Sequence, residues 1–181
     1  MRLELIAATT IGALAPASAF AVDYLSAEQA ARLMFPEADA FVAHEIAFDA
    51  AQLQQLEAQG VKPRSARWTV RTATRAGASL GWVVTDEVVG KVELIGYAVG
   101  IALDGSIKQV EILSYRESHG HEVRLPAWRR QFVGKGPGAA IRVGEDIANI
   151  SGATLSCTHV AEGVRRIVAI VAAARARGAL A

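Results

Sequence analysis

Residues 99–113 read VGIALDGSIKQVEIL and contain two apolar runs separated by Asp104-Gly105. Aliphatic residues dominate both Val99–Leu103 and Ile107–Leu113, which is typical of β-strands. An Asp-Gly pair between two such runs is a strong hairpin signal, because both residues tolerate the positive φ that a two-residue turn requires. We therefore predict two neighbouring antiparallel strands joined at Asp104-Gly105.

The strand pattern extends to the N-terminal side of this hairpin. β-Branched and aromatic residues recur in Trp68-Thr69-Val70, Trp82-Val83-Val84-Thr85 and Val92-Glu93-Leu94-Ile95, with glycine and aspartate between the runs. Residues 67–115 are thus expected to form a meander of strands.

Two helices are predicted before the meander. Ser26-Ala27-Glu28-Gln29 has the form of a capping box, and the apolar spacing that follows ends at Phe35-Pro36. Asp49 and Gln52 form a second capping box, with Phe48 and Leu53 at the positions of a hydrophobic staple. Gly60 is expected to end this helix.

Helical spacing returns after the meander. Trp128 and Phe132 stand four residues apart, which predicts a short amphipathic helix that is broken at Gly134. A long final helix is expected to begin near Ser156 or Thr158 and to stop at Gly178. Its apolar face comprises Val160, Val164, Ile167, Val168 and Val171. The predicted fold is α+β: a single domain over residues 22–181, with an antiparallel meander sheet and flanking helices.

The first 21 residues have the pattern of a secretory signal peptide. Arg2 precedes an apolar run from Leu5 to Leu14, and Ala17, Ala19 and Ala21 fit a small-residue cleavage site, so we expect cleavage after Ala19 or Ala21 and a periplasmic product. The run is too short to span a bilayer, so no membrane insertion is expected after cleavage. The net charge of +1 gives no electrostatic reason to expect a nucleic-acid partner.

A loop of small residues, Ser151-Gly152-Ala153-Thr154, leads through Leu155 and Ser156 into the final helix. Small side chains let a phosphate approach the backbone N–H groups, and a helix N-terminus attracts anions. The alternative is a capped helix start without a ligand. We expect Ser151 and Ser156 to support the loop by capping and by hydrogen bonds.

Other chemically suggestive residues have simpler interpretations. Cys157, the single cysteine, is expected to be a small buried side chain rather than a nucleophile activated by His159. His119 and His121 alone make a weak metal site. The pairs Arg129-Arg130 and Arg165-Arg166 are expected to be mainly solvated, with pairing of one arginine to a phosphate or a redox partner as the alternative.

Three motifs occur in a fixed order: Glu117-Ser118-His119-Gly120, then Trp128 with the segment 131–135 (QFVGK), then the 151–156 loop. This order resembles the FMN-binding domain family, which includes the flavin subunits of the Rnf and Na-translocating NADH:quinone oxidoreductase complexes. The resemblance extends over about residues 96–170.

The resemblance implies that Thr154 carries FMN through a phosphoester bond, transferred from FAD by a Mg-dependent flavin transferase. It also implies a set of cofactor-binding residues: Ser151, Gly152, Ala153, Thr154, Leu155, Ser156, Glu117, Ser118, His119, Gly120 and Trp128. No residue needs to perform substrate chemistry, and no metal site is expected.

The implied function is electron transport between a membrane-bound donor and a periplasmic or membrane acceptor. The alternative is a sensory or binding module that holds FMN noncovalently or not at all and docks to a membrane partner. Ala148 keeps this alternative open, because the flavin subunits usually carry an aspartate at that position.

Overall fold

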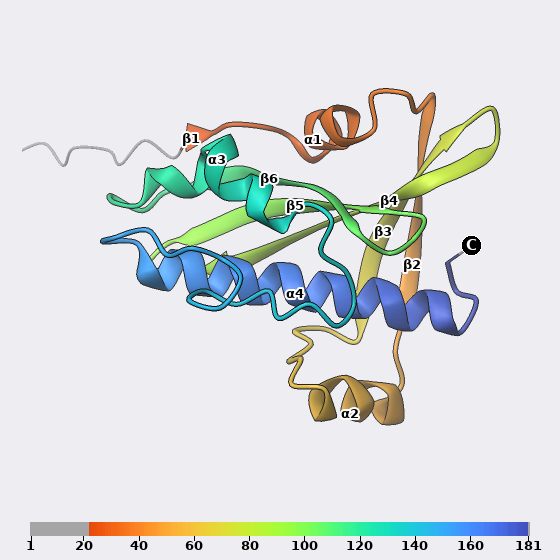
Figure 1. Ribbon diagram of the computed structural model, residues 1–181. Coiled ribbons are helices and arrows are strands. Elements are labelled where there is room, and N and C mark those ends of the chain that lie inside the picture. Colours follow the sequence, from red (N-terminus) through yellow and green to blue (C-terminus); the bar gives the residue numbers. More distant parts are fainter. Residues whose placement is uncertain (1–21, 181) are drawn as a thin grey trace, which may run out of the picture.

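The computed structural model describes residues 22–180, so the predicted signal peptide, residues 1–21, lies outside the described residues. A six-stranded antiparallel sheet has the order β1-β6-β5-β4-β3-β2 (Figure 1). Its strands are β1 (Val22–Asp23), β2 (Ala40–Ala47), β3 (Arg67–Arg75), β4 (Ala78–Val89), β5 (Leu94–Ala102) and β6 (Ile107–Tyr115). The predicted α+β class and meander are confirmed.

The β5–β6 hairpin forms as predicted, but its turn differs. The N–H of Gly105 donates to the carbonyl of Ala102 at 2.9 Å, and the N–H of Ala102 donates to the carbonyl of Ser106 at 2.8 Å. Gly105 has φ +92°, whereas Asp104 lies at negative φ. The connection is therefore a type I turn followed by a left-handed glycine, not a two-residue turn. The Asp104 carboxylate instead accepts from the N–H of Ser106 at 2.8 Å.

Strand β2 was not predicted, because most of its side chains are exposed and its sequence, AFVAHEIA, shows little alternation. It forms an edge of the sheet and pairs with β3 along its whole length, from Ala40 opposite Thr74 to Ala47 opposite Arg67. Backbone pairing rather than side-chain burial holds this strand.

Both predicted capping boxes form. Ser26 and Gln29 exchange hydrogen bonds at the start of α1 (Ala27–Met34), and Asp49 and Gln52 do so at the start of α2 (Ala50–Ala58). The C-terminal elements are the 3-10 turn η1 (His121–Arg124), α3 (Pro126–Arg129), the 3-10 turn η2 (Arg130–Phe132) and α4 (Thr154–Ala176).

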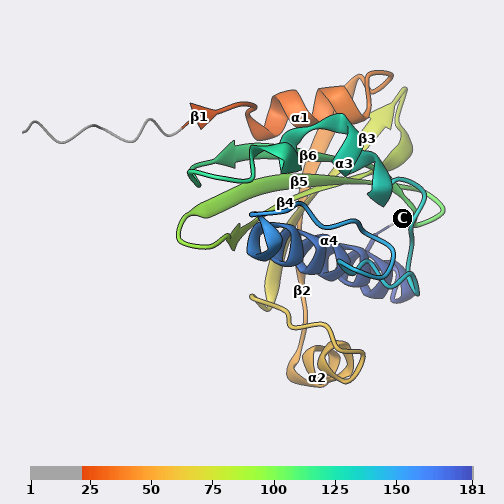
Figure 2. The ribbon, with the colours of Figure 1, turned by 60° about the vertical axis from the view of Figure 1, so that its left-hand side comes forward.

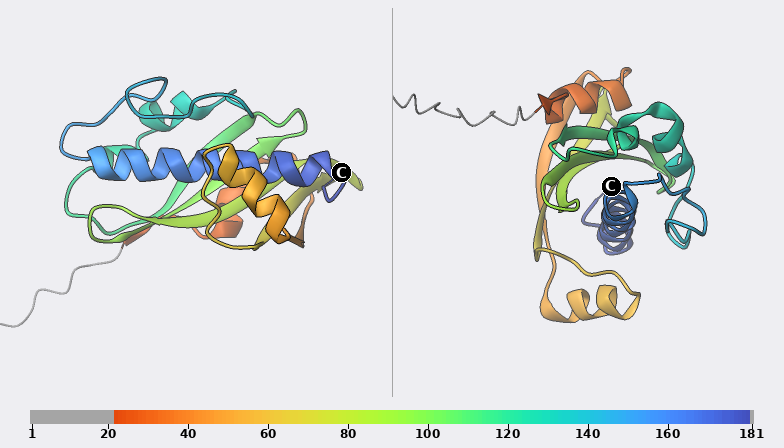
Figure 3. Two further views of the ribbon diagram at one scale, coloured as in Figure 1. Left: turned by 90° about the horizontal axis from the view of Figure 1, so that it is seen from below. Right: turned by 90° about the vertical axis from the view of Figure 1, so that its left-hand side faces the viewer.

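Helices cover both faces of the sheet. Figure 3 shows α1 outside the curved sheet and α4 within its concave side. Met34 and Phe35 are buried with Ala73, Val83 and Ala98 on the α1 side. The larger core lies between the sheet and α4, whose predicted apolar face is buried as expected, and there Trp128 and Phe132 pack edge to face with ring centroids 5.1 Å apart.

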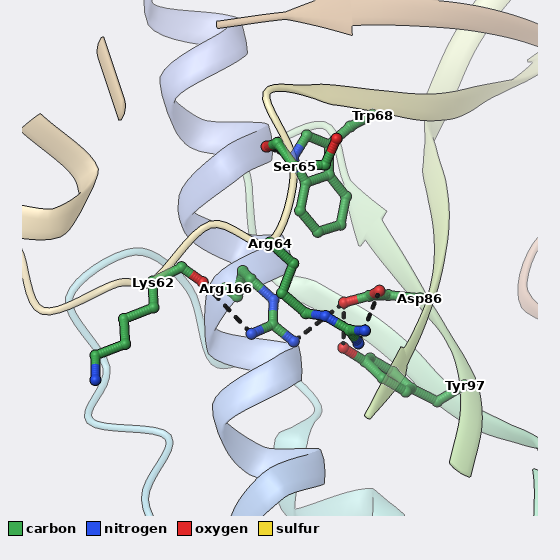
Figure 4. Close-up of polar contacts among 7 residues, drawn as sticks. All are labelled: Lys62, Arg64, Ser65, Trp68, Asp86, Tyr97 and Arg166. Carbon is green, nitrogen blue, oxygen red and sulfur yellow. Dashed lines mark hydrogen bonds and ion pairs between the residues drawn. The ribbon is translucent and has the colours of Figure 1, made fainter. Parts of the chain in front are cut away.

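A buried polar cluster fixes the middle of α4 on the sheet (Figure 4). Asp86 of β4 accepts a hydrogen bond from Tyr97 of β5 at 3.0 Å and one from Arg166 of α4 at 3.1 Å. Burial, and then the charge of Asp86, raise the pKa of the Tyr97 hydroxyl. At Gly163 the helix approaches so closely that an added Cβ would lie 2.1 Å from the Tyr97 hydroxyl.

The expectation that both arginine pairs are mainly solvated is wrong for one member of each. Arg166 belongs to the Asp86 cluster, with only 11% of its side chain exposed. Arg129 forms an ion pair with the buried carboxylate of Glu111 and donates to the carbonyl of Val110 at 2.6 Å. Both guanidinium groups hold helices to the sheet.

Helix α2 stands away from the body of the protein, below α4 in the view of Figure 2. Leu56 is its single fully buried side chain, and Phe48 and Val61 anchor the segments on either side. No helix among residues 22–180 is long and apolar enough to cross a bilayer.

Candidate functional site

The final helix begins at Thr154, two to four residues earlier than predicted. Gly152 adopts φ +81°, and the N–H of Ala153 closes a turn on the carbonyl of Ile150 at 3.0 Å. The first helical bond then runs from the N–H of Cys157 to the carbonyl of Ala153 at 2.9 Å. This turn directs the chain into the helix before the apolar periodicity starts, which is why the periodicity placed the start too late.

The first turn of α4 has no side-chain cap. Its N-cap residue is Ala153, with ψ 22°, and no side chain accepts a hydrogen bond from this turn. The expected capping by Ser151 and Ser156 is therefore absent: Ser151 is exposed, and Ser156 is buried against the sheet side. The N–H groups of Thr154, Leu155 and Ser156 remain available to an anion.

Thr154 presents its hydroxyl at this open end. The side chain is exposed, and its Oγ1 accepts a hydrogen bond from the side-chain amide of Asn149 at 3.0 Å. Leu155 beside it is 49% exposed. An added Cβ on Gly152 would meet nothing within 4 Å, so this side of the loop is open.

The Glu117–Gly120 loop lies directly against the Thr154 loop. An added Cβ on Gly120, which has φ +83°, would lie 2.3 Å from the Cβ of Ala153. The hydroxyl of Tyr115 donates to the carbonyl of His119 at 2.5 Å and lies 3.4 Å from the hydroxyl of Ser156. Two segments more than 30 residues apart are thus joined at one end of α4.

Glu117 ties this loop to the β4–β5 turn. Its carboxylate accepts hydrogen bonds from the N–H groups of Val92 at 2.6 Å and Glu93 at 3.0 Å. Burial raises the pKa of this carboxyl, but the backbone N–H groups lower it by more, so the net shift is downward. Glu117 is therefore a buried carboxylate whose hydrogen bonds to backbone N–H groups hold its loop against the β4–β5 turn.

Ser118 and His119 form the exposed part of the loop. The hydroxyl of Ser118 lies 2.9 Å from Nδ1 of His119, and both side chains face solvent. They are exposed polar groups on the loop that packs against Ala153.

Trp128 is a buried residue that holds the chain just before the Thr154 loop. It is 5% exposed, and its indole N–H donates to the carbonyl of Ala148 at 2.8 Å. The side chain of Gln131 accepts from the N–H of Ala148 at 2.7 Å. Residues from the Trp128 motif therefore hold both backbone groups of residue 148 and fix the start of the loop that carries Thr154.

Cys157 and His159 do not form a catalytic pair. Cys157 is fully buried, and burial raises the pKa of its thiol. His159 instead lies with Nδ1 2.6 Å from the carbonyl of Val89. Within residues 22–180, no three His, Cys, Asp or Glu side chains gather as a metal site.

Comparison with known proteins agrees with this geometry. Residues 90–169 match the FMN-binding domain family, and the matched segment contains every site residue described above. Residues 90–169 form an FMN-binding domain. The crystal structure of NqrC from Shewanella oneidensis has a similar fold, with a TM-score of 0.50 at 18% identity over 74% of this chain and 80% of that chain. No curated protein matches the sequence.

The residues of this FMN-binding domain fit a phosphate group. An uncapped helix N-terminus supplies N–H donors and positive dipole, small residues leave room above them, and a hydroxyl stands in the first turn. Sequence reasoning missed Asn149 and Tyr115, because neither lies in a motif: one contacts Thr154 and the other joins the two loops.

Proposed function

We propose that the protein is an exported flavoprotein that carries electrons through FMN joined to Thr154 by a phosphoester bond. The observation that carries the proposal is the exposed Thr154 hydroxyl in the uncapped first turn of a 23-residue helix, inside the segment that matches the FMN-binding domain family. The NqrC-like fold supports the electron-transfer part of the proposal.

The attachment reaction balances with FAD as the co-reactant. Thr154 Oγ1 attacks the FAD phosphorus that bears the riboflavin portion, and an O–P bond forms. The bond from that phosphorus to the bridging pyrophosphate oxygen breaks, AMP leaves with the electron pair, and the hydroxyl proton passes to a base. A separate Mg-dependent flavin transferase is the proposed catalyst.

The chain's own residues hold and shield the cofactor. The N–H groups at the start of α4 would bind the phosphate oxygens, and Asn149 orients the Thr154 hydroxyl at 3.0 Å. His119 and Ser118 lie on the loop that contacts Ala153, so they are placed to contact the ring or the ribityl chain. When bound, FMN supplies the electron chemistry, and the protein tunes it by burial, hydrogen bonds and charge.

Coexpression with a periplasmic flavin transferase tests the attachment. We expect the intact mass to rise by one FMN less one water and the denatured protein to remain yellow. Thr154→Val keeps the side-chain volume and removes the hydroxyl, so it should abolish the adduct. Ser151→Ala removes an exposed hydroxyl three residues away and should retain it. A normal adduct in Thr154→Val, or a colourless wild-type protein, would overturn the proposal; colour lost on denaturation would favour noncovalent FMN.

Export is a separate part of the proposal. It rests on the sequence pattern of residues 1–21, and it predicts a mature chain that begins at Phe20 or Val22. N-terminal sequencing of the periplasmic fraction tests it, and a cytoplasmic protein that begins at Met1 would contradict it. The proposed electron donor is a membrane-bound reductase, and the proposed acceptor lies in the periplasm or the membrane.

A further inference from the structure

A second cavity of the protein lies far from Thr154. It is a cleft of 760 Å³ between α2, residues 136–142 and the C-terminal half of α4. Val168, near its middle, follows Thr154 by 14 residues, which is about 21 Å along a helix. The cleft is thus a second feature of the molecule, separate from the helix end that fits FMN.

Two arginines of α4 hold the two ends of α2 beside this cleft. Arg165 donates to the carbonyl of Gly60, just after α2, at 2.8 Å. Arg177 donates to the side chain of Gln52, in the first turn of α2, at 2.9 Å, and its guanidinium lies 4.4 Å from the ring centroid of Phe48. These contacts link α2 to α4 beside the cleft.

All charged residues that line the cleft are positive. Its titratable lining residues are Arg142, Arg165 and Arg177, and no aspartate or glutamate is among the residues that line it. Arg142 pairs with Glu145 at 3.3 Å, whereas Arg165 and Arg177 bond only to neutral oxygens within residues 22–180. In a chain with 19 basic and 18 acidic residues, such a lining favours an anionic ligand.

The rest of the lining is apolar or neutral. It includes alanines of α4, the aliphatic residues Leu56, Val61 and Ile141, and the glutamines of α2 with their amide groups. The alanines are Ala169, Ala172, Ala173 and Ala176. A cleft of this size and lining is typical of small-molecule sites.

We propose that this cleft binds a small amphipathic organic anion, with its acidic group at Arg165 or Arg177 and its apolar body over the alanine face of α4. The guanidinium groups would form charge-assisted hydrogen bonds with a carboxylate, sulfonate or phosphate. The proposal stands independently of flavin attachment, because none of residues 151–156 lines the cleft.

A pair of fluorescent probes tests the site in flavin-free protein. The anion 8-anilinonaphthalene-1-sulfonate should bind with enhanced fluorescence and raise the melting temperature. Its neutral analogue without the sulfonate, N-phenyl-1-naphthylamine, should bind more weakly. Arg165→Gln and Arg177→Gln should each weaken binding of the sulfonate about tenfold and leave the neutral probe unchanged.

Two further variants make the result specific. Ala173→Leu fills the cleft without changing charge and should weaken binding of both probes. Arg130→Gln removes an exposed arginine outside the cleft and should leave both affinities unchanged. Equal sulfonate affinity in wild type, Arg165→Gln and Arg177→Gln would overturn the proposal. So would a melting temperature lowered by the sulfonate, because it would show binding to the unfolded chain.

Discussion

The N-termini of α1 and α2 differ from that of α4. The first two helices begin with reciprocal capping boxes on extended N-cap residues, Ser26 at ψ 161° and Asp49 at ψ 173°. The much longer α4 begins at Ala153, with ψ 22° and no side-chain acceptor. The chain therefore caps two short helices at the surface and leaves uncapped the helix end at which we propose that FMN is attached. This difference fits the proposed phosphate site, because the N–H groups in the first turn of α4 have no side-chain acceptor.

The largest loss of stability is expected from a substitution at Gly120, which packs against Ala153 at the N-terminus of α4. Gly120→Ala forces a Cβ to within 2.3 Å of the Ala153 side chain at φ +83°, so the free energy of unfolding should fall by about 3 kcal/mol. Gly152→Ala has nearly the same φ but open space, and it should cost about 1 kcal/mol. Urea unfolding of both variants measures this difference. Equal losses would mean that the two loops are not packed together.

Glu117 should make the stability of this end depend on pH. Its carboxyl has a lowered pKa in the folded protein, so its contribution is present above the unfolded pKa of about 4.3 and is lost as pH falls through the folded pKa. Glu117→Gln should cost about 2 kcal/mol at pH 7. Urea unfolding at several pH values measures the difference in free energy of unfolding between wild type and Glu117→Gln. This difference should become smaller below pH 4. A gap that is constant with pH would contradict this assignment.

The caps themselves can be compared directly. Ser26→Ala and Asp49→Ala each remove a capping acceptor, so each should lower the free energy of unfolding by about 1 kcal/mol. Ser151→Ala, beside the uncapped helix, should stay within about 0.5 kcal/mol of wild type. Thermal and urea unfolding give these values. A loss at Ser151 as large as that at Ser26 would show that α4 is capped after all.

A negative charge introduced at the uncapped N-terminus of α4 should have opposite effects on protein stability and on flavin attachment. Leu155 is half exposed in the first turn of α4, where no acidic residue stands. Leu155→Glu should stabilise flavin-free protein by about 0.5 kcal/mol through the helix dipole. It should also lower the yield of attached flavin, because the carboxylate repels the phosphate. Leu155→Gln controls for the loss of the leucine, and the same yield in both variants would argue against an anion site.

The elements predicted from the sequence were those with local signals. The capping boxes at Ser26 and Asp49 and the glycine-dependent β5–β6 turn are fixed by residues a few positions apart. Strand β2 has no such pattern, because backbone pairing with β3 holds it at the edge of the sheet.

Contacts between distant residues could not be predicted in this way. Arg166 and Asp86 are 80 residues apart, and nothing in the local sequence distinguishes that arginine from Arg165 beside it. For the site, the motifs indicated the Glu117 and Thr154 loops, but their contact through Gly120 and Tyr115 required the fold. Trp128 was expected among the cofactor-binding residues, and the fold adds that its indole N–H holds the carbonyl of Ala148.

Phosphorus-31 NMR of flavin-loaded protein tests the central claim, that the open end of α4 holds a phosphate esterified to Thr154. A diester has no second acidic proton, so a single resonance should stay fixed from pH 5 to pH 8, both in the folded protein and after denaturation in urea. A phosphate monoester titrates with a pKa of about 6. A resonance that shifts through that range in urea would show free FMN and contradict the account.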